Sequence, residues 1–170
     1  MLLSNLPTQV SSFIGRDTEL AEVRRLLGRS RLVTLTGTGG VGKTRLGLQL
    51  AAGLAGGGGD GVWFADLAPL TDPDLVAVTV ADVLGVRPQP GRPVLEALVE
   101  ALGGRSLLVL LDNCEHVVGA CAGLADALLR GCPNLALLAT ARQPLGVDGE
   151  QVYRVPSLAT PAGGASGRGG

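Results

Sequence analysis

Short, continuously apolar runs alternate with amphipathic segments along most of the chain. The apolar, β-branched runs predict buried strands, and the segments whose apolar residues recur every three or four positions predict helices. We expect strands at 31–36, 62–67, 106–112, 134–140 and 151–155, and helices at 17–27, 42–55, 93–102 and 117–130, with a further helix starting at 72–73. Strands that are apolar throughout and alternate with helices are typical of a parallel sheet covered on both faces. The pattern therefore predicts a three-layer α/β fold around a mainly parallel sheet of about five strands.

Single residues within this pattern predict where elements end and how the chain divides. Asp17 is predicted as the N-cap of the first helix, and Gly28 is expected to close it. Gly131 is expected just past the end of the helix at 117–130. Residues 1–12 are interpreted as a leader, residues 13–156 as one folded domain, and the Gly-, Ser- and Pro-containing residues 157–170 as a disordered tail.

Composition and charge narrow the possible functions. The 170 residues are 46% apolar with a formal net charge of −1, which argues against a chain that binds nucleic acid through a basic surface. No apolar run approaches the ~20 residues that a membrane-spanning helix needs, and the N-terminus lacks a signal-peptide pattern. The 3 cysteines have spacings that suit neither a disulfide framework nor a metal knuckle. We therefore expect a cytoplasmic protein that binds neither nucleic acid nor membrane through this chain.

Residues 37–44, GTGGVGKT, match the pattern G-x-x-x-x-G-K-[ST] at every required position, between a predicted strand and a predicted helix. Glycines let backbone N–H groups turn inward, and the helix N-terminus adds its positive dipole end, so the loop suits phosphate. Lys43, the only lysine in the sequence, would reach the β and γ phosphates, and the Thr44 hydroxyl would bind Mg²⁺. The shorter dinucleotide pattern G-x-G-x-x-G lies inside this motif, but the Lys-Thr ending favours a nucleoside triphosphate over NAD. The predicted nucleotide-contacting residues here are Gly37, Thr38, Gly39, Gly40, Val41, Gly42, Lys43, Thr44 and Arg45.

The apolar strand at 106–112 ends in an acid, Asp112, as a Walker B strand does. An acid at the carboxyl end of a parallel strand faces the ligand crevice, so Asp112 is a candidate Mg²⁺ residue together with Thr44; the alternative is a strand-end Asp that caps the next helix. Many ATP-hydrolysing relatives carry a water-polarising acid at the next position, where this chain has Asn113. Glu115 is the nearest carboxylate that could act instead, and it could equally face solvent or cap the following helix.

Arg142 follows the strand at 134–140 and could contact the γ-phosphate of a bound nucleotide. An arginine at this place would report whether that phosphate is present. The alternative is an arginine that is simply solvated at a strand end.

Several of these segments together resemble the nucleotide-binding module of STAND-class P-loop ATPases. The likeness is greatest to the NB-ARC-like module of large bacterial LuxR-type transcriptional regulators. The segments, which follow the family order over about residues 5–158, are FIGRD from Phe13, TGTGGVGKTRL from Thr36, LLVLLDNCEH from Leu107, LLATARQPLGVDGE from Leu137 and VYRVPSL from Val152. The resemblance therefore implies a P-loop NTPase fold that binds ATP or ADP with Mg²⁺.

The resemblance also implies roles for individual residues. Ile14, Gly15 and Arg16 would lie near the adenine base, and Arg142 would act as the sensor of the γ-phosphate. The strand at 31–36 would be central in the sheet, beside the strand at 134–140, with the strand at 62–67 at one edge. Family members continue into a helical and a winged-helix domain. The resemblance therefore implies either a truncated chain or a module whose partner domains lie on another chain, and its partners would be other domains or chains of a regulatory ATPase.

The leading hypothesis is an ATP/ADP-binding switch module of a signalling ATPase, with weak Mg²⁺-dependent hydrolysis at best, in which Lys43, Asp112, Glu115 and Arg142 carry any catalysis. A small P-loop phosphotransferase is the enzyme alternative, although the late arginines that such kinases use in a lid stand isolated here. A non-functional remnant of a larger protein is a third reading.

Overall fold

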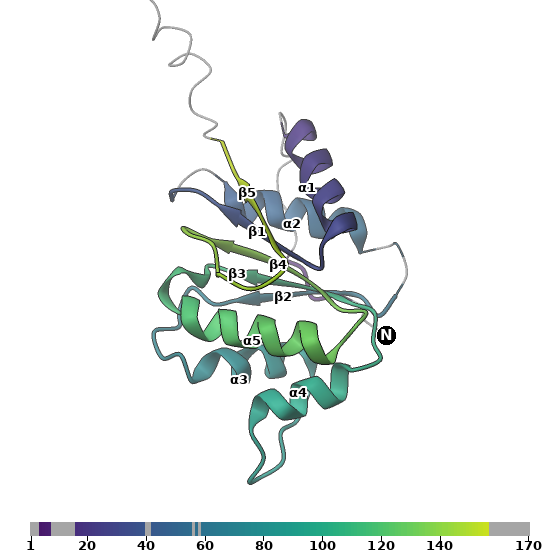
Figure 1. Ribbon diagram of the computed structural model, residues 1–170, viewed down its shortest axis with the longest axis vertical. Helices are drawn as coiled ribbons and strands as arrows, with labels where there is room; N and C mark the ends of the chain where they lie inside the picture. Colours follow the sequence, from purple (N-terminus) through teal and green to yellow (C-terminus); the bar gives the residue numbers. More distant parts are fainter. Residues whose placement is uncertain (1–3, 8–15, 40–41, 56, 58, 157–170) are drawn as a thin grey trace, which may run out of the picture.

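A five-stranded parallel sheet between two layers of helices forms the framework of the computed structural model (Figure 1). The structure describes residues 4–7, 16–39, 42–55, 57 and 59–156. The strands are β1 (Leu32–Thr36), β2 (Val62–Asp66), β3 (Leu108–Asp112), β4 (Ala136–Ala141) and β5 (Glu150–Arg154). The helices are α1 (Asp17–Arg29), α2 (Lys43–Leu54), α3 (Leu75–Leu84), α4 (Val94–Leu102) and α5 (Val118–Gly131), with a 3-10 turn η1 (Cys114–His116). The predicted α/β fold is confirmed.

The strands lie in the order β2-β3-β4-β1-β5, and every neighbouring pair is parallel. As the resemblance implied, β1 lies beside β4 and β2 lies at one edge. The middle position, however, belongs to β4 rather than to β1, because β5 adds a single strand beyond β1. Parallel neighbours bring the carboxyl ends of β1, β3 and β4 together at one edge of the sheet, where ligands bind in such folds.

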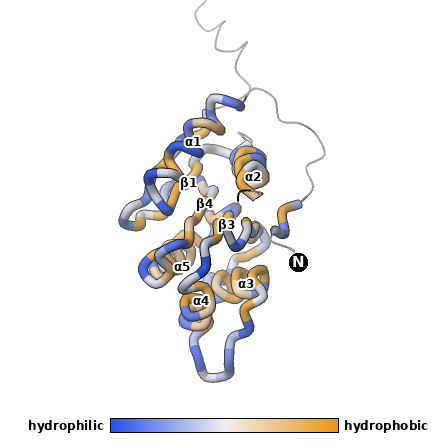
Figure 2. Tube along the Cα trace, turned by 90° about the vertical axis from the view of Figure 1, so that its right-hand side faces the viewer, coloured by the Kyte–Doolittle hydropathy of each residue, from blue (hydrophilic) through white to orange (hydrophobic). Residues whose placement is uncertain are grey.

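Helices α1 and α2 cover one face of the sheet, and α3, α4 and α5 cover the other (Figure 1). Because side chains alternate across a strand, β1 sends Val33 and Leu35 into the α1/α2 side, where Leu46 and Leu50 of α2 meet them. The opposite cluster includes Leu98 of α4 and Leu124 of α5. Figure 2 shows the same arrangement: apolar residues follow the strands and the inner helix surfaces, and polar residues follow the outside.

Three predicted helix boundaries were wrong. Asp17 is the first residue of α1 rather than its N-cap, where its charge interacts favourably with the helix dipole. Gly28 lies inside α1, which continues to Arg29; α1 is exposed there, and a glycine in a helix lowers its stability without ending it. Gly131 is the last residue of α5, not the residue after it. A Cβ atom at Gly131 would collide with Cγ1 of Val99, so close packing of α5 against α4 explains this glycine.

The start of α3 also differs from the sequence-based expectation. The helix begins at Leu75, because Asp72 first forms a turn. The Asp72 carboxylate accepts a hydrogen bond from the N–H of Asp74 at 2.9 Å, and the backbone carbonyl of Asp72 accepts one from the N–H of Leu75 at 3.0 Å. This local side-chain bond competes with the helix and delays it by about one turn.

Arg31, directly before β1, holds the C-terminal end of α5. Its guanidinium donates to the carbonyls of Leu129 at 2.8 Å, Cys132 at 2.9 Å and Leu135 at 3.2 Å. The last carbonyls of a helix have no partner within the helix, and a cation there also suits the negative end of the dipole. Arg31 therefore joins two elements that lie about a hundred positions apart in the sequence.

Residues 4–7 lie along the free edge of β2. Ser4 forms a parallel bridge with Val62, and the side-chain amide of Asn5 makes two hydrogen bonds with the backbone of Phe64. Its Nδ2 donates to the Phe64 carbonyl at 2.9 Å, and its Oδ1 accepts from the Phe64 N–H at 2.6 Å. Leu6 then packs against the α1/α2 side of the core. The Asn5 side chain thus pairs with the edge of β2 at Phe64 in the way that the backbone of a neighbouring strand would.

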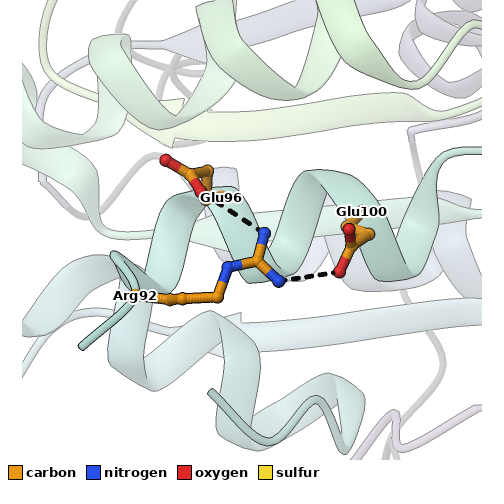
Figure 3. A network of polar contacts seen from close by, with 3 residues as sticks. All are labelled: Arg92, Glu96 and Glu100. Atoms are coloured by element: carbon orange, nitrogen blue, oxygen red, sulfur yellow. Dashed lines mark hydrogen bonds and ion pairs between the residues drawn. The ribbon is translucent and has the colours of Figure 1, made fainter. Parts of the chain in front are cut away.

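The outer surface of α4 carries a small ionic network. Arg92 donates to Glu100 at 3.0 Å and to Glu96 at 3.3 Å (Figure 3). Both carboxylates are more than half exposed, so solvent screens these pairs and they add little to stability. Among the described residues, every helix is too short or too polar to cross a membrane.

Candidate functional site

The glycine-rich loop connects β1 to α2, and its backbone has the shape that its glycines allow. Gly37 has φ 152° and Gly42 has φ 85°, a region that L side chains rarely adopt. Gly42 is also the N-cap of α2 and has no side chain with which to cap it. Gly42 therefore leaves the first helical turn without a side-chain cap, and the N–H groups of such a turn are the groups that bind anions at a helix N-terminus. Gly40 and Val41, two predicted phosphate-contacting residues, lie outside the described residues.

Lys43, the first residue of α2, points its amine back into this loop. The side chain is largely buried, and Nζ donates to the carbonyl of Gly37 at 2.7 Å and to that of Thr38 at 3.4 Å. A buried ammonium needs hydrogen-bond partners, and these two carbonyls supply them. The loop thus carries a positive charge at the place where a phosphate would enter.

Thr44 and Asp112 meet between α2 and β3. The Thr44 hydroxyl lies 2.9 Å from Oδ1 and 3.1 Å from Oδ2 of Asp112. Asp112 is the last residue of β3 and is 2% exposed, so its carboxylate is held against the start of α2. A carboxylate and a hydroxyl are the hard oxygen ligands that Mg²⁺ prefers, which means that this pair fits the cation predicted from the sequence.

Thr140 was not predicted as a site residue, although it contacts the same carboxylate. It lies near the end of β4, is completely buried, and donates to Oδ1 of Asp112 at 2.7 Å. Its oxygen also accepts a hydrogen bond from the N–H of Asn113 at 2.9 Å. The available signal was a hydroxyl residue near the end of an apolar strand, and it becomes meaningful only once β4 is known to lie beside β3.

The surroundings of Asp112 favour its protonated form. Burial is the largest influence and raises the pKa of Asp112 above its ordinary value, while hydrogen bonds from Thr140 and Thr44 act in the opposite direction. The negative charges of Asp66 and Glu115 raise this pKa further. A carboxylate kept ionised against this tendency gains from a cation beside it.

The chain turns sharply after Asp112. Asn113 has the left-handed backbone conformation, with φ 62° and ψ 57°, and its Nδ2 donates to Oδ2 of Asp112 at 2.8 Å. The turn leads into η1, which contains Glu115. Oε1 of Glu115 is buried and has no hydrogen-bond partner among the described residues. Glu115 is thus a half-buried carboxylate close enough to Asp112 to influence its ionisation.

Arg142 lies beside the phosphate loop. A Cβ atom built on Gly39 would be 3.6 Å from Nη2 of Arg142, so the guanidinium reaches the loop from the end of β4 while the residue remains exposed. Arg45 is exposed on α2. The structure therefore brings Arg142 together with the loop that carries Lys43.

Arg16 also lies at the carboxyl-end edge of the sheet, near the end of β5. Its guanidinium is completely buried, donates to the carbonyl of Pro156 at 3.2 Å and lies 3.6 Å from the Glu19 carboxylate. Pro156 follows Val155, whose N–H donates to the carbonyl of Thr36 directly before the loop. Ile14 and Gly15, predicted with Arg16 near the adenine, lie outside the described residues.

Solved ATPase structures share this arrangement of strands and helices. The chain is similar to the Signal Transduction ATPase with Numerous Domains (STAND) protein with a tetratricopeptide repeat sensor from Pyrococcus horikoshii, with a TM-score of 0.62 and 16% identity over 88% of this chain and 24% of that one. It is also similar to Cdc6p from Pyrobaculum aerophilum, with a TM-score of 0.61 and 20% identity over 89% of this chain and 47% of that one. The fold is that of P-loop ATPases.

Curated relatives share more of the sequence. An uncharacterised protein of Mycobacterium tuberculosis is 46% identical over 149 residues, 88% of this chain. A second protein of that organism, named as an HTH-type transcriptional regulator, is 51% identical over 136 residues, 80% of this chain. The regulatory protein AfsR of Streptomyces coelicolor is 34% identical over 157 residues, 82% of this chain. The chain spans 38% of the length of the first relative and 15% of the length of each of the other two. No family model matches.

Proposed function

We propose that the chain is the ATP/ADP-binding module of a cytoplasmic STAND-type regulatory ATPase of the NB-ARC-like kind. It works as a nucleotide switch and hydrolyses ATP slowly at best. The observation that carries this proposal is the contact of Thr44 with both carboxylate oxygens of Asp112, at 2.9 and 3.1 Å, directly behind the phosphate loop. That contact joins the two residues that a Mg²⁺-nucleotide complex needs most.

Each polar residue of the site then has a role. The loop N–H groups and Lys43 bind the phosphates, with the amine exchanging its bonds to Gly37 and Thr38 for phosphate oxygens. Thr44 and Asp112 would hold Mg²⁺, which would supply positive charge to offset that of the phosphates. Arg142, beside the loop at Gly39, reports the presence of the γ-phosphate.

Arg16 belongs to the adenine side of this site and connects it to the C-terminal end of β5. Its bond to the carbonyl of Pro156 ties the start of α1 to the segment that leaves the sheet after Val155. A nucleotide that draws Arg16 toward its base would loosen this tie. The module therefore has a direct route from nucleotide to whatever follows Pro156.

The relatives support a regulatory setting. One is named as an HTH-type transcriptional regulator and another as the regulatory protein AfsR, and each is several times longer than the matched segment. We assign DNA binding, and the reading of the signal, to parts of such proteins outside this module. The partners of the module are then other domains or chains of the regulator.

Titration calorimetry with Mg²⁺-ATP and Mg²⁺-ADP tests the proposal. Lys43→Ala removes a charge-assisted contact, so ATP affinity should fall roughly 10- to 150-fold. Arg29→Ala removes a cation at the end of α1, where the chain enters the opposite edge of the sheet, and should leave the affinity unchanged. Equal affinity of wild type and Lys43→Ala would remove the assignment of the loop.

A further inference from the structure

Thr140 makes two hydrogen bonds that sheet formation does not require. Its hydroxyl donates to Oδ1 of Asp112 at 2.7 Å and accepts from the N–H of Asn113 at 2.9 Å. A hydroxyl has one proton and two lone pairs, so both bonds form at the same time. One side chain on β4 thus fixes both the carboxylate at the end of β3 and the backbone of the residue that follows it.

The two threonines at Asp112 occupy different positions. Thr44 keeps some exposure and contacts both carboxylate oxygens from the phosphate-loop side, whereas Thr140 is completely buried and contacts Oδ1 alone. Thr140 is therefore enclosed behind the carboxylate. Its bond holds Asp112 from behind, so that the carboxylate faces Thr44 and the phosphate loop.

We infer that Thr140 is a positioning residue that sets the Mg²⁺ dependence of nucleotide binding by holding Asp112 and the turn at Asn113. The inference rests on the proposed function, because it assigns Mg²⁺ to Asp112. Partners that orient a metal-binding side chain typically change metal affinity by roughly 10- to 100-fold when they are removed. A carboxylate without the Thr140 bond can rotate away from Thr44, and the Asn113 N–H, without its acceptor, loosens the turn.

Valine at position 140 separates the hydrogen bonds from the packing. Cγ2 of Thr140 lies 3.7 Å from the position that a Cβ on Gly47 would take, so the methyl group already packs against α2. Thr140→Val keeps this methyl group and replaces the hydroxyl with a second methyl group of similar size. Thr140→Ser keeps the hydroxyl and removes the methyl.

The test compares ADP affinity with excess Mg²⁺ and with a chelator, by calorimetry, on the full chain. We expect the ratio of the two affinities to fall roughly 10- to 100-fold in Thr140→Val and to return in Thr140→Ser, while affinity without Mg²⁺ stays close to wild type. In an Asp112→Asn background, Thr140→Val should change the ratio no further, since its effect passes through that carboxylate.

Thr34→Val is the matched control. Thr34 is another completely buried strand threonine, and its hydroxyl has no partner among the described residues, so its loss should leave the Mg²⁺ ratio unchanged. Should Thr140→Val fail to fold, Thr140→Cys replaces it, because a thiol has similar size and donates weakly.

Three results would contradict the inference. An unchanged ratio in Thr140→Val, or in Thr140→Cys if the valine variant does not fold, overturns it, as does an equal loss in Thr34→Val. A wild-type chain that binds no nucleotide in either condition overturns the proposed function, and the inference with it.

Discussion

Asp66 and Asp112 stand opposite each other in the parallel register of β2 and β3, so two carboxylates end neighbouring strands at the same edge of the sheet. Asp66 is exposed, and its Oδ1 accepts the N–H of Ala68 at 3.0 Å, whereas Asp112 is buried. Water surrounds the Asp66 carboxylate, whereas burial and the negative charge of Asp66 both oppose ionisation of Asp112. Folding therefore costs free energy at Asp112 that a bound cation would offset.

This arrangement predicts how stability depends on pH in the absence of nucleotide. Burial, opposed by bonds from Thr140 and Thr44, raises the folded-state pKa of Asp112 above its ordinary value of 3.8. The folded chain then holds this proton more tightly than the unfolded chain does, so stability is lost as pH rises from 3.8 through the raised pKa. Asp112→Asn has no carboxyl group to titrate at this position. As the pH rises from 3.8 to the raised pKa, the unfolding free energy of this variant should therefore increase relative to that of wild type, and the difference should stay constant at higher pH.

Urea unfolding of both chains at a series of pH values measures the difference. Asp66→Asn keeps the acceptor for the N–H of Ala68 but removes the like charge beside Asp112. It should therefore narrow the pH range over which the stability changes. A difference between wild type and Asp112→Asn that is the same at every pH would show that this carboxyl group titrates alike in the folded and unfolded chains.

Nucleotide preference provides a second prediction. The sequence contains no N-K-x-D motif of the kind that reads guanine, and its only lysine lies in the phosphate loop. We expect ATP and ADP to bind more tightly than GTP. Competition against labelled ADP measures this preference; GTP that competes as well as ATP would exclude the adenine assignment.

Turnover should be slow. Asn113 occupies the position of the usual water-polarising acid, and an arginine supplied by a partner can alone be worth about 10³- to 10⁵-fold in rate. We expect on the order of one ATP per many minutes for the isolated chain. Glu115, whose buried Oε1 has no hydrogen-bond partner in the described part of the chain, is our candidate base, so Glu115→Gln should abolish the residual rate and leave ATP affinity intact.

Phosphate release from purified protein measures this rate. Glu100→Gln, which changes an exposed carboxylate on α4, is the control and should have no effect. Several turnovers per second without partners would contradict the proposed switch and indicate an enzyme. A wild-type rate in Glu115→Gln would show that Glu115 is not the base.

Arg31 predicts a stability effect far from the site. Arg31→Ala removes the guanidinium that donates to the carbonyls of Leu129, Cys132 and Leu135, and the loss of these bonds should lower the unfolding free energy by about 1–2 kcal/mol. Arg130→Ala removes an arginine from the same helix end that pairs with the exposed Asp126, and should change stability little. Denaturant melts compare the two; equal effects would mean that the carbonyl contacts of Arg31 add nothing.

The strands could be predicted within a residue or two because buried parallel strands require continuous apolar runs. Most helix ends also fell within two residues of the prediction, but the role of a glycine at a helix end could not be predicted, because tertiary contacts decide it. Gly131 has the residue type of a helix-ending glycine, yet it is needed because Val99 of α4 leaves no room for a Cβ atom. Nothing near Gly131 in the sequence reveals that neighbour.

The candidate site divides in the same way. Lys43, Thr44 and Asp112 lie in motifs whose spacing is visible in the sequence. Thr140 carries no such mark, because threonine is an ordinary strand residue. It becomes a site residue only because β4 lies beside β3, and the bond from Arg16 to Pro156 likewise depends on where β5 is placed.

The side chain of Asn5 makes residues 4–7 a cover for the exposed edge of β2. By pairing with both the N–H and the carbonyl of Phe64, it satisfies groups that an edge strand would otherwise present to another molecule. Exposed edges recruit further strands and lead to aggregation. A chain shortened to begin at Arg16 would therefore uncover β2, and its self-association would reflect a lost edge cover rather than any property of the nucleotide site.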